Sequence, residues 1–492
     1  MINKEDRRSV YIMASYYIGI DLGTSSLKGL LVDADGSIVK SESRDYPVYY
    51  PHPGWSEQDP ADWVKAMREV LSVLGSGVEN DVKGISFGGQ MHGLVVLDAD
   101  DNVIRPCILW NDGRTESQTA YLNETVGRQC LSKLTGNIAF AGFTAPKLLW
   151  LKENEPDNFA RISKIMLPKD YLAYTLTGVF STDYSDASGT LLLDVENKVW
   201  STEMCEICGV RPEWLPDLYE SYEITGYVKP GFGLTDAAVT AGAGDNAAAA
   251  VGTGTVFNGS CNISLGTSGT VFISRDGFSV DPNNALHSFA HANGKWHLMG
   301  CILSAASCRK WWIEDILGSD DYSADESLAA GSESGDVIFL PYLMGERSPH
   351  NDTRIRGAFI GLSADTSRAQ MSRAVMEGVA FALCDCLRVA SECGADIRES
   401  TICGGGARSE IWCQIIADVL DIPVSIPVTE QGPGYGAALL AMIGTGALGG
   451  FDDIIPLTQK NKTFYPDKNS CYAEKYEKFR KLYPAIRCAM EK

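Results

Sequence analysis

Short apolar runs separated by polar turns fill the first part of the chain. Residues 16–20, 27–32 and 37–44 form three such runs, and residues 33–36 have turn chemistry. Runs of this length with turn residues between them are typical of neighbouring antiparallel strands. We therefore predict a three-strand meander over residues 16–44.

Apolar residues at helical spacing come next. Asp59 precedes Pro60, which is a capping residue followed by proline at the first helical position. The positions that share one helical face are Trp63, Met67, Val70, Leu71 and Leu74. Gly75 follows them, and glycine commonly ends a helix. The pattern predicts an amphipathic helix that starts at residue 60 and is closed by Gly75.

Two buried strands are expected at residues 82–87 and 94–97. Between them lies Gly88-Gly89-Gln90-Met91-His92-Gly93. This segment is too rich in glycine for the interior of a strand. We therefore expect a loop over residues 88–93.

The second part of the chain repeats this order of elements. Strands are expected at 261–265, 270–274, 400–403 and 422–426, a turn at 404–407, and helices at 409–420 and 434–443. The apolar face expected for the first of these helices is Ile411, Ile415, Ile416, Val419 and Leu420. Glycine, serine and threonine dominate residues 252–260. We predict two α/β domains, at 16–256 and 257–485, facing each other across a cleft.

The tetrapeptide Leu-Gly-Thr-Ser occurs at 22–25 and again at 265–268, each time where an apolar run ends. A strand that runs into such a turn offers backbone N–H groups and hydroxyls to an anion. Two copies in two halves indicate a duplicated fold that holds phosphate from both sides. The alternative is a chance match of four residues.

Composition narrows the possible partners. A chain of 492 residues, 45% of them apolar, can bury two large cores. The net charge of −21 argues against nucleic acid or an anionic membrane, because both require a basic surface. A bound phosphate must then be neutralised locally, by a metal ion, by helix N-termini or by a few lysines and arginines.

The cysteines and the start of the chain bear on the compartment. The 14 cysteines are scattered, so we expect them to be reduced, and the Cys-x-x-Cys at 205–208 has no second pair at zinc-site spacing. No apolar run is long enough to span a membrane, and residues 1–8 lack the apolar stretch of a signal peptide. We predict a cytoplasmic protein whose working start lies near Met13.

Asp21 and the residues after it form the first candidate site. Asp21 ends an apolar run and is suited to hold Mg²⁺, directly or through water. Thr24 and Ser25 offer hydroxyls to a phosphate, and Lys28 on the next strand is within reach of one. The alternative is that Asp21 only caps the turn and that Lys28 is solvated.

Gly244-Asp245-Asn246 forms the second candidate site. It follows the apolar run 237–241 and opens a run of small residues, so the acid lies at a switch from strand to helix. An accessible carboxylate there can accept a hydroxyl proton as the general base of phosphoryl transfer. Asn246 can hydrogen-bond a sugar hydroxyl. The alternative is that Asp245 is a helix N-cap.

Other polar residues suit a polyol or a nucleotide. Gln90, Met91 and His92 combine donors, acceptors and an apolar sulfur, although a single histidine in a loop is often structural. Trp110 and Asp112 offer an aromatic wall and a polar arm. In the second half, the turn at 404–407 would let an adenine or ribose approach the backbone closely, because Gly405 and Gly406 carry no side chain.

These motifs together resemble one family. The segments that carry the resemblance are 21–25, 244–246, 265–269 and 404–408, with longer signatures at 142–150 and 357–378. They resemble the FGGY carbohydrate kinases of the actin–Hsp70–sugar kinase superfamily, over nearly the whole of residues 16–485. Segments at 51–60, 89–93, 108–114, 167–172 and 340–347 are most similar to the members that phosphorylate xylulose.

The resemblance implies an α/β fold of two duplicated actin/Hsp70-like (ribonuclease H-like) domains and an ATP-dependent sugar kinase. It implies that Asp245 is the base and that D-xylulose becomes D-xylulose 5-phosphate, with Mg²⁺ near Asp21 and Asp245. With the patterns above, the predicted sugar contacts are Gln90, Met91, His92, Trp110, Asp112, Asp245 and Asn246. The predicted ATP contacts are Thr24, Ser25, Lys28, Gly266, Thr267, Gly405 and Gly406.

Two positions depart from the glycerol kinases of that family. Lys28 stands where those enzymes carry arginine, so a bidentate phosphate contact is lost. Met91 and His92 stand where they carry arginine and glutamate, which disfavours glycerol and favours a ketose.

Two alternatives stay open. The first is another FGGY kinase, acting on ribulose, gluconate or a related polyol. The second is an actin- or Hsp70-like ATPase without sugar kinase activity. The predicted partners are a ketose, ATP and a second copy of the chain in a homodimer, with no nucleic acid and no membrane.

Overall fold

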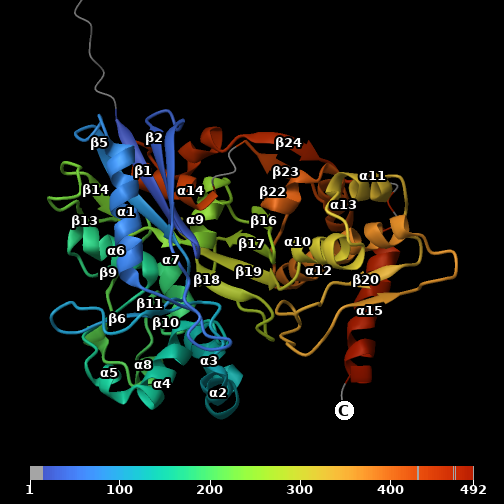
Figure 1. The fold of residues 1–492 in the computed structure, drawn as a ribbon, viewed down its shortest axis with the longest axis horizontal. Coiled ribbons are helices and arrows are strands. Elements are labelled where there is room, and N and C mark those ends of the chain that lie inside the picture. The colour runs from blue at the N-terminus through green and yellow to red at the C-terminus, as the bar shows by residue number, and fades with distance from the viewer. Residues whose placement is uncertain (1–14, 429–431, 469, 471, 491–492) are drawn as a thin grey trace, which may run out of the picture.

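The computed structural model describes residues 15–428, 432–468, 470 and 472–490 (Figure 1). The expectation about Met13 as the working start lies outside the described residues.

The first half of the chain builds a mixed sheet in the order β13-β14-β5-β1-β2-β3, with β15 beside β5. The strands are β1 (Tyr16–Leu22), β2 (Ser26–Asp33), β3 (Ile38–Asp45), β5 (Val82–Gly89), β13 (Ile224–Tyr227), β14 (Ala238–Thr240) and β15 (Ala243–Gly244). β1, β2 and β3 pair antiparallel, which confirms the predicted meander. β1, β5 and β14 run parallel, and β13 is an antiparallel edge.

The second half builds a sheet in the order β18-β19-β17-β16-β22-β23-β24. The strands are β16 (Cys261–Leu265), β17 (Gly269–Arg275), β18 (His287–Ala290), β19 (Trp296–Ile302), β22 (Ser400–Cys403), β23 (Val424–Pro427) and β24 (Lys460–Phe464). β16, β17 and β19 pair antiparallel, β16, β22 and β23 run parallel, and β24 is an antiparallel edge. The first sheet has the same sequence of pairings from β1 outward, so the predicted duplication is confirmed in the topology.

One expectation about the first sheet is wrong. Gly88 and Gly89 are not loop residues but the last two residues of β5, opposite Asp21 and Leu22 of β1. Glycine is needed there for space, because a Cβ on Gly89 would lie 2.8 Å from Cβ of Lys169. The loop begins only at Gln90, whose N–H donates to Leu22 O.

The predicted first helix is α1 (Pro60–Gly75). The Asp59 side chain accepts a hydrogen bond from the N–H of Ala61, so it acts as the N-cap. The five predicted apolar positions are buried. The helix ends at Gly75, although the glycine with a left-handed backbone is Gly77, two residues later.

Two helices join the halves. α9 (Asp245–Gly252) belongs to the first half and α14 (Gly432–Gly444) comes from the second, yet α14 packs on β1 and β5 of the first sheet. In Figure 1 both helices lie between the two sheets. Their approach is so close that a Cβ on Gly436 would lie 1.8 Å from Ala248 O. The domain limits at 16–256 and 257–485 therefore remain a prediction, because a helix from the second range completes the core of the first.

Helices and two-stranded sheets complete the two halves. In the first half they are α2 (Glu116–Ala120), α3 (Arg128–Thr135), α4 (Thr144–Asn154), α5 (Pro156–Ala160), α6 (Pro168–Thr177), α7 (Tyr184–Ala187), α8 (Thr202–Cys208) and the strand pairs β4–β7 (Glu57–Gln58 with Cys107–Ile108), β6–β8 (Val95–Leu97 with Lys164–Met166), β9–β12 (Ser181–Asp183 with Asp217–Tyr219) and β10–β11 (Leu193–Asp194 with Val199–Trp200). In the second they are α10 (Ala306–Lys310), α11 (Tyr322–Ala330), α12 (Arg368–Glu392), α13 (Glu410–Leu420), α15 (Tyr472–Met490) and the pair β20–β21 (Ile338–Leu340 with Ala358–Ile360).

The buried face of α13 is shifted from the predicted one. Trp412 and Cys413 are buried together with Ile415 and Ile416, whereas Ile411, Val419 and Leu420 are half-buried. Ser409 caps the helix through its side chain, so α13 begins at Glu410, one residue after the predicted start. Within the described part of the chain, no helix has both the length and the apolar character needed to cross a membrane.

Candidate active site

The parallel strands bring two distant carboxylates to one edge of the first sheet. Asp21 is paired with Gly88 on β5, and Gly88 is paired in turn with Ala243 on β15. Asp245 follows β15 directly, as the first residue of α9. Because the carboxyl ends of parallel strands meet at one edge of a sheet, Asp21 and Asp245 become neighbours.

Burial disfavours the charged form of both carboxylates. It raises the pKa of Asp21 to about 7, and the charge of Asp245 raises it further while Lys28, opposite on β2, opposes the shift. Burial raises the pKa of Asp245 to about 6, although hydrogen bonds from Asn246 counteract it. A carboxylate with a pKa near neutrality is a competent general base at physiological pH.

The Asp245 side chain bonds to the next residue and does not cap the helix. Its Oδ1 accepts hydrogen bonds from the backbone N–H of Asn246 at 2.7 Å and from Nδ2 of Asn246 at 2.9 Å. Gly244 occupies the N-cap position, so the reading of Asp245 as an N-cap is wrong. Among the described residues no hydrogen bond engages Oδ2 of Asp245, which leaves that oxygen for a substrate.

The first Leu-Gly-Thr-Ser turn is tied to two predicted sugar residues. Thr24 Oγ1 donates to Gln90 Oε1 at 3.3 Å, and Trp110 Nε1 donates to Thr24 Oγ1 at 3.0 Å. Tyr46 donates its hydroxyl to the carbonyl of Gly23. Ser25 is exposed beside them. The turn therefore keeps its hydroxyls at the edge of the sheet, next to the loop that follows β5.

Gln58 organises this turn, and the sequence analysis did not single it out. It is fully buried, and its Nε2 donates to Thr24 O at 2.6 Å. Its Oε1 accepts from Trp63 Nε1 at 3.1 Å and from Gln90 Nε2 at 2.9 Å. Gln90 is itself 3% exposed, so its side chain bonds to Gln58 inside the protein. In the sequence, Gln58 stands two residues before a helix start, inside the segment 51–60 that carries part of the resemblance.

The His92 ring is held by a hydrogen bond and by an aromatic contact. Its backbone has a φ of 69°, which is unusual for a residue with a side chain. Nδ1 lies 2.7 Å from Gly189 O, and the ring stacks on Phe143 with centroids 4.6 Å apart. Burial lowers the pKa of His92 to about 3, so the ring is neutral. Since a carbonyl only accepts, Nδ1 carries the hydrogen, and Nε2 is left as an acceptor for a hydroxyl.

Met91 contacts the residue that precedes the catalytic candidate. It is 5% exposed, and a Cβ on Gly244 would lie 3.0 Å from its sulfur. The loop after β5 and the turn before α9 thus pack directly on each other. Met91 therefore lies against the residue next to Asp245.

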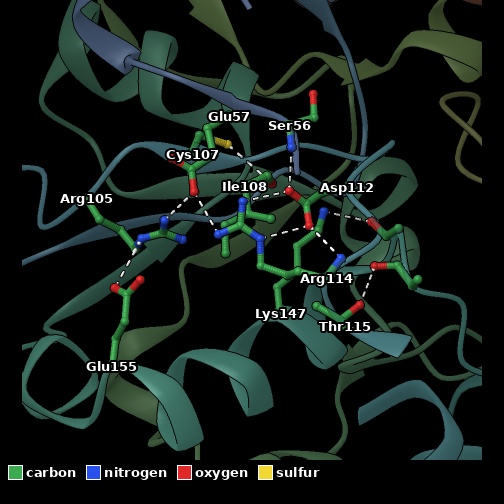
Figure 2. Close-up of polar contacts among 12 residues, drawn as sticks. Ser56, Glu57, Arg105, Cys107, Ile108, Asp112, Arg114, Thr115, Lys147 and Glu155 are labelled. Atoms are coloured by element: carbon green, nitrogen blue, oxygen red, sulfur yellow. Dashed lines mark hydrogen bonds and ion pairs between the residues drawn. The ribbon is translucent and has the colours of Figure 1, made fainter. Parts of the chain in front are cut away.

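Trp110 and Asp112 differ in their exposure to solvent. Trp110 is 45% exposed, whereas Asp112 is 2% exposed. Figure 2 shows the Asp112 carboxylate accepting from Ser56 N at 2.6 Å and from Nε and Nη2 of Arg114 at 2.8 and 2.7 Å. Arg114 also pairs with Glu57 at 2.7 Å. Asp112 is therefore used inside the protein to fix the loop that carries Trp110.

A buried charge cluster lies beneath the catalytic candidate, and the sequence analysis missed it. Lys169 Nζ pairs with Asp170 at 2.6 Å and with Asp183 at 2.8 Å, and all three side chains are buried. Asp183 accepts from Ser185 Oγ, which in turn accepts from Gly244 N at 3.1 Å. The cluster thereby anchors the turn that carries Asp245. The signal was a Lys-Asp pair inside an otherwise apolar segment.

The nucleotide candidates of the second half also meet at one sheet edge. β16 and β22 run parallel with Ser264 opposite Cys403, so the turns that follow these strands are adjacent. Thr267 is exposed and its carbonyl accepts from Ala305 N at 2.9 Å, while Gly266 O accepts from Ala306 N at 2.8 Å. Gly405 opens the short helix 405–408 and has no atom within 4 Å of where a Cβ would be. Gly406 is buried against Leu265.

The predicted residues thus form two groups. Within the first half, hydrogen bonds and packing join Thr24, Gln90 and Trp110, and join Met91 to the turn of Asp245. Over the described ranges, no hydrogen bond links this group to Thr267 or Gly405.

Family models match the chain in two consecutive parts. They describe the N-terminal domain of the FGGY family of carbohydrate kinases, over residues 16–252, and its C-terminal domain, over residues 261–445. The chain belongs to the FGGY family of carbohydrate kinases. The xylulose kinase of Escherichia coli (strain K12) is 42% identical over 96% of this chain and 99% of its own length. That of Bacillus subtilis (strain 168) is 37% identical over 96% of each.

Solved structures give the same picture of this FGGY chain. A xyloylose kinase from Brucella ovis has a TM-score of 0.92 at 42% identity, covering 96% of this chain and 100% of that one. A gluconate kinase from Lactobacillus acidophilus has a TM-score of 0.91 at 27% identity, covering 97% of this chain and 98% of that one. The duplicated α/β fold is therefore shared with enzymes named for different sugars.

The carboxylates of this FGGY site fit a magnesium ion. No group of three or more histidine, cysteine, aspartate or glutamate residues suited to a metal exists within the described residues. Mg²⁺, however, usually keeps several waters and takes one or two carboxylates with substrate phosphates. Desolvation raises the pKa of both Asp21 and Asp245, and the charge of Asp245 adds to the shift of Asp21, a cost that a bound cation would relieve.

Proposed function

We propose that this chain is an ATP-dependent kinase that phosphorylates D-xylulose to D-xylulose 5-phosphate. The observation that carries the proposal is Asp245, a carboxylate with a pKa of about 6 whose turn packs on Met91, beside the neutral His92. The xylulose kinases at 42% and 37% identity, over almost their whole lengths, support this choice of sugar.

In the proposed mechanism, Asp245 accepts the proton of the C5 hydroxyl of the open-chain sugar. The hydroxyl oxygen forms a bond to the γ-phosphorus of ATP, and the bond from that phosphorus to the β,γ-bridging oxygen breaks, so ADP leaves. The proton stays on Asp245 until the product departs. His92 Nε2 accepts a hydrogen bond from a sugar hydroxyl. Asn246 and Trp110 complete the polar sugar contacts, and Met91 supplies an apolar one.

The phosphate groups are proposed to lie between the two Leu-Gly-Thr-Ser turns. Thr24, Ser25 and Lys28 contact them from the first half, and Gly266 and Thr267 from the second. Gly405 and Gly406 lie against the nucleoside. Asp21 and Asp245 would hold Mg²⁺, directly or through water, and the bound ion would neutralise charge on the phosphates.

Gln90 and Asp112 have indirect roles in this proposal. Gln90 bonds to Gln58 and Thr24, and Asp112 bonds to Ser56 and Arg114. Both therefore shape the sugar site through their neighbours. The homodimer is proposed from family resemblance alone, and sedimentation equilibrium tests it.

A second candidate substrate is gluconate. The solved gluconate kinase and a solved xylulose kinase, both from Lactobacillus acidophilus, have the same identity of 27% and the same TM-score of 0.91 to this chain. Similarity to these two folds does not separate the two sugars.

The deciding experiment measures ADP release with D-xylulose, ribulose, gluconate and glycerol, and identifies each product by mass. We expect the highest kcat/KM with D-xylulose and almost no ADP release without sugar. A higher kcat/KM with gluconate would transfer the proposal to that sugar. Sugar-independent ATP hydrolysis with no phosphorylated product would instead favour an actin- or Hsp70-like ATPase.

A further inference from the structure

Lys147 is a buried lysine next to His92, one of the proposed sugar contacts. It is the fourth residue of α4, is fully buried, and has the apolar neighbours Ala145, Leu148 and Leu149 along the helix. No carboxylate lies within ion-pair distance of its Nζ among the described residues. Burial lowers the pKa of Lys147 to about 7. An unpaired buried lysine costs stability, so a role other than stability is indicated.

The lysine donates hydrogen bonds to two backbone carbonyls. Nζ donates to His92 O at 2.8 Å and to Gly142 O at 2.8 Å. Both the ammonium and the neutral amine have at least two N–H groups, so the two bonds persist in either protonation state.

The first carbonyl belongs to His92, which is proposed to contact the sugar. Thr144 Oγ1 also donates to His92 O, at 3.1 Å, so the start of α4 holds this carbonyl with two donors. His92 has a left-handed backbone, with a φ of 69°. Such a conformation persists only where surrounding contacts over-determine it. The direction of the imidazole ring follows from this backbone geometry.

The second carbonyl belongs to a residue pressed against the Trp110 loop. A Cβ on Gly142 would lie 2.3 Å from Trp110 O, so the two backbones touch. The same loop is fixed from its other side by the Asp112–Arg114 pair, and Lys147 lies beside that pair (Figure 2). Lys147 therefore contacts the loop of His92 directly, and it contacts the Trp110 loop through Gly142.

We propose that Lys147 is a positioning residue, which holds His92 and the Trp110 loop in the arrangement that binds the ketose. It does not touch the substrate. The proposal rests on the proposed function, because it assumes that His92 and Trp110 contact the sugar.

The test compares Lys147→Met with the wild type and with Lys152→Met. Methionine is unbranched and only one atom shorter than lysine, but it donates no hydrogen bond. Lys152 lies on the same helix and is exposed, so it controls for the change of residue type. Steady-state kinetics give KM for the sugar and for ATP, and calorimetry gives the sugar Kd without nucleotide. We expect Lys147→Met to raise the sugar KM and Kd about tenfold or more, with the ATP KM changed less than twofold, and Lys152→Met to change neither.

A second variant covers the case in which Lys147→Met does not fold. Thr144→Val removes the other donor to His92 O and leaves the lysine in place. It should raise the sugar KM about threefold to tenfold at constant ATP KM. Equal changes in both KM values, or no change in either, would overturn the positioning role. Wild-type activity toward D-xylulose tests the proposed function separately, and the same comparison applies to whichever sugar the wild type phosphorylates.

Discussion

At the residue scale, two carboxylates that lie far apart in the sequence share one edge of a sheet. Neither Asp21 nor Asp245 has a salt bridge among the described residues, and burial raises the pKa of both. Such an arrangement is costly for folding and useful for proton transfer. Two predictions follow from the opposite demands of stability and catalysis.

The first concerns the rate. Asp245→Asn should lower kcat for sugar phosphorylation about 10²–10⁴-fold, because the amide cannot accept the hydroxyl proton. ATP binding, measured by fluorescence with a nucleotide analogue, should change little. In the wild type, kcat/KM should fall below about pH 6, where Asp245 becomes protonated. Near-normal turnover of the variant would exclude this residue as the base.

The second concerns stability. The pKa of Asp21 is about 7 in the folded protein and near 4 when the chain is unfolded, so the folded state binds more protons between these values. Folding stability therefore falls as the pH rises through this window. Asp21→Asn removes the loss, so it should stabilise the protein by about 1–3 kcal/mol at pH 8 and by much less at pH 4.

Denaturation in urea with a chelator present measures this difference. The control is Asp35→Asn, an exposed residue in the turn between β2 and β3. An equal gain in stability at both pH values would contradict the assigned cause.

At the element scale, glycines mark where backbones or ligands come close. Gly405 and Gly436 illustrate two different reasons. A Cβ at Gly405 meets no atom within 4 Å, whereas one at Gly436 would lie 1.8 Å from Ala248 O. The first glycine is therefore free in the protein alone, and the second is required by the contact of α14 with α9.

Gly405→Ala tests the nucleotide site. The new methyl group fits the fold, so the melting temperature should stay within about 1 °C of the wild type. It should nevertheless raise the ATP KM severalfold, because it occupies the space assigned to the nucleoside, with the sugar KM unchanged. An unaltered ATP KM would remove Gly405 from the nucleotide site.

Gly436→Ala tests the seam between the halves. Alanine favours helices, yet here it forces α14 and α9 apart, so the free energy of unfolding should fall by about 1–3 kcal/mol. Gly277→Ala is the control, since a Cβ there, unlike one on Gly436, meets no atom within 4 Å. Equal stability of both variants would contradict the close packing of the two helices.

At the scale of the whole molecule, the residues of the proposed site are divided between two sheets. Met91, His92 and Asp245 belong to the first half, and Thr267 and Gly405 to the second. The γ-phosphate and the sugar hydroxyl must come within reacting distance for transfer to occur. α9 and α14 lie between the halves and pack on each other.

Binding of both substrates should therefore close the molecule. Small-angle scattering with D-xylulose and a non-hydrolysable ATP analogue should give a smaller radius of gyration than the free protein. Each ligand alone is the control. An unchanged radius, with both ligands shown to be bound, would count against closure as the step that assembles the site.

The sequence by itself determined the repeated elements and the catalytic candidate. The spacing of apolar residues is a local property, so the meander, α1 and β16 were predictable, and Asp245 stood out as an acid between a strand and a helix. Only the tertiary structure decided that Gly88 belongs to β5. Glycine is used there because neighbouring elements leave little space for a side chain, and the sequence does not show which elements are neighbours. It also turned Asp112 inward, toward Arg114. Gln58, Lys147 and Lys169 were missed for the same reason. Each has a partner that is distant in the sequence, and only the fold shows that these polar side chains are buried.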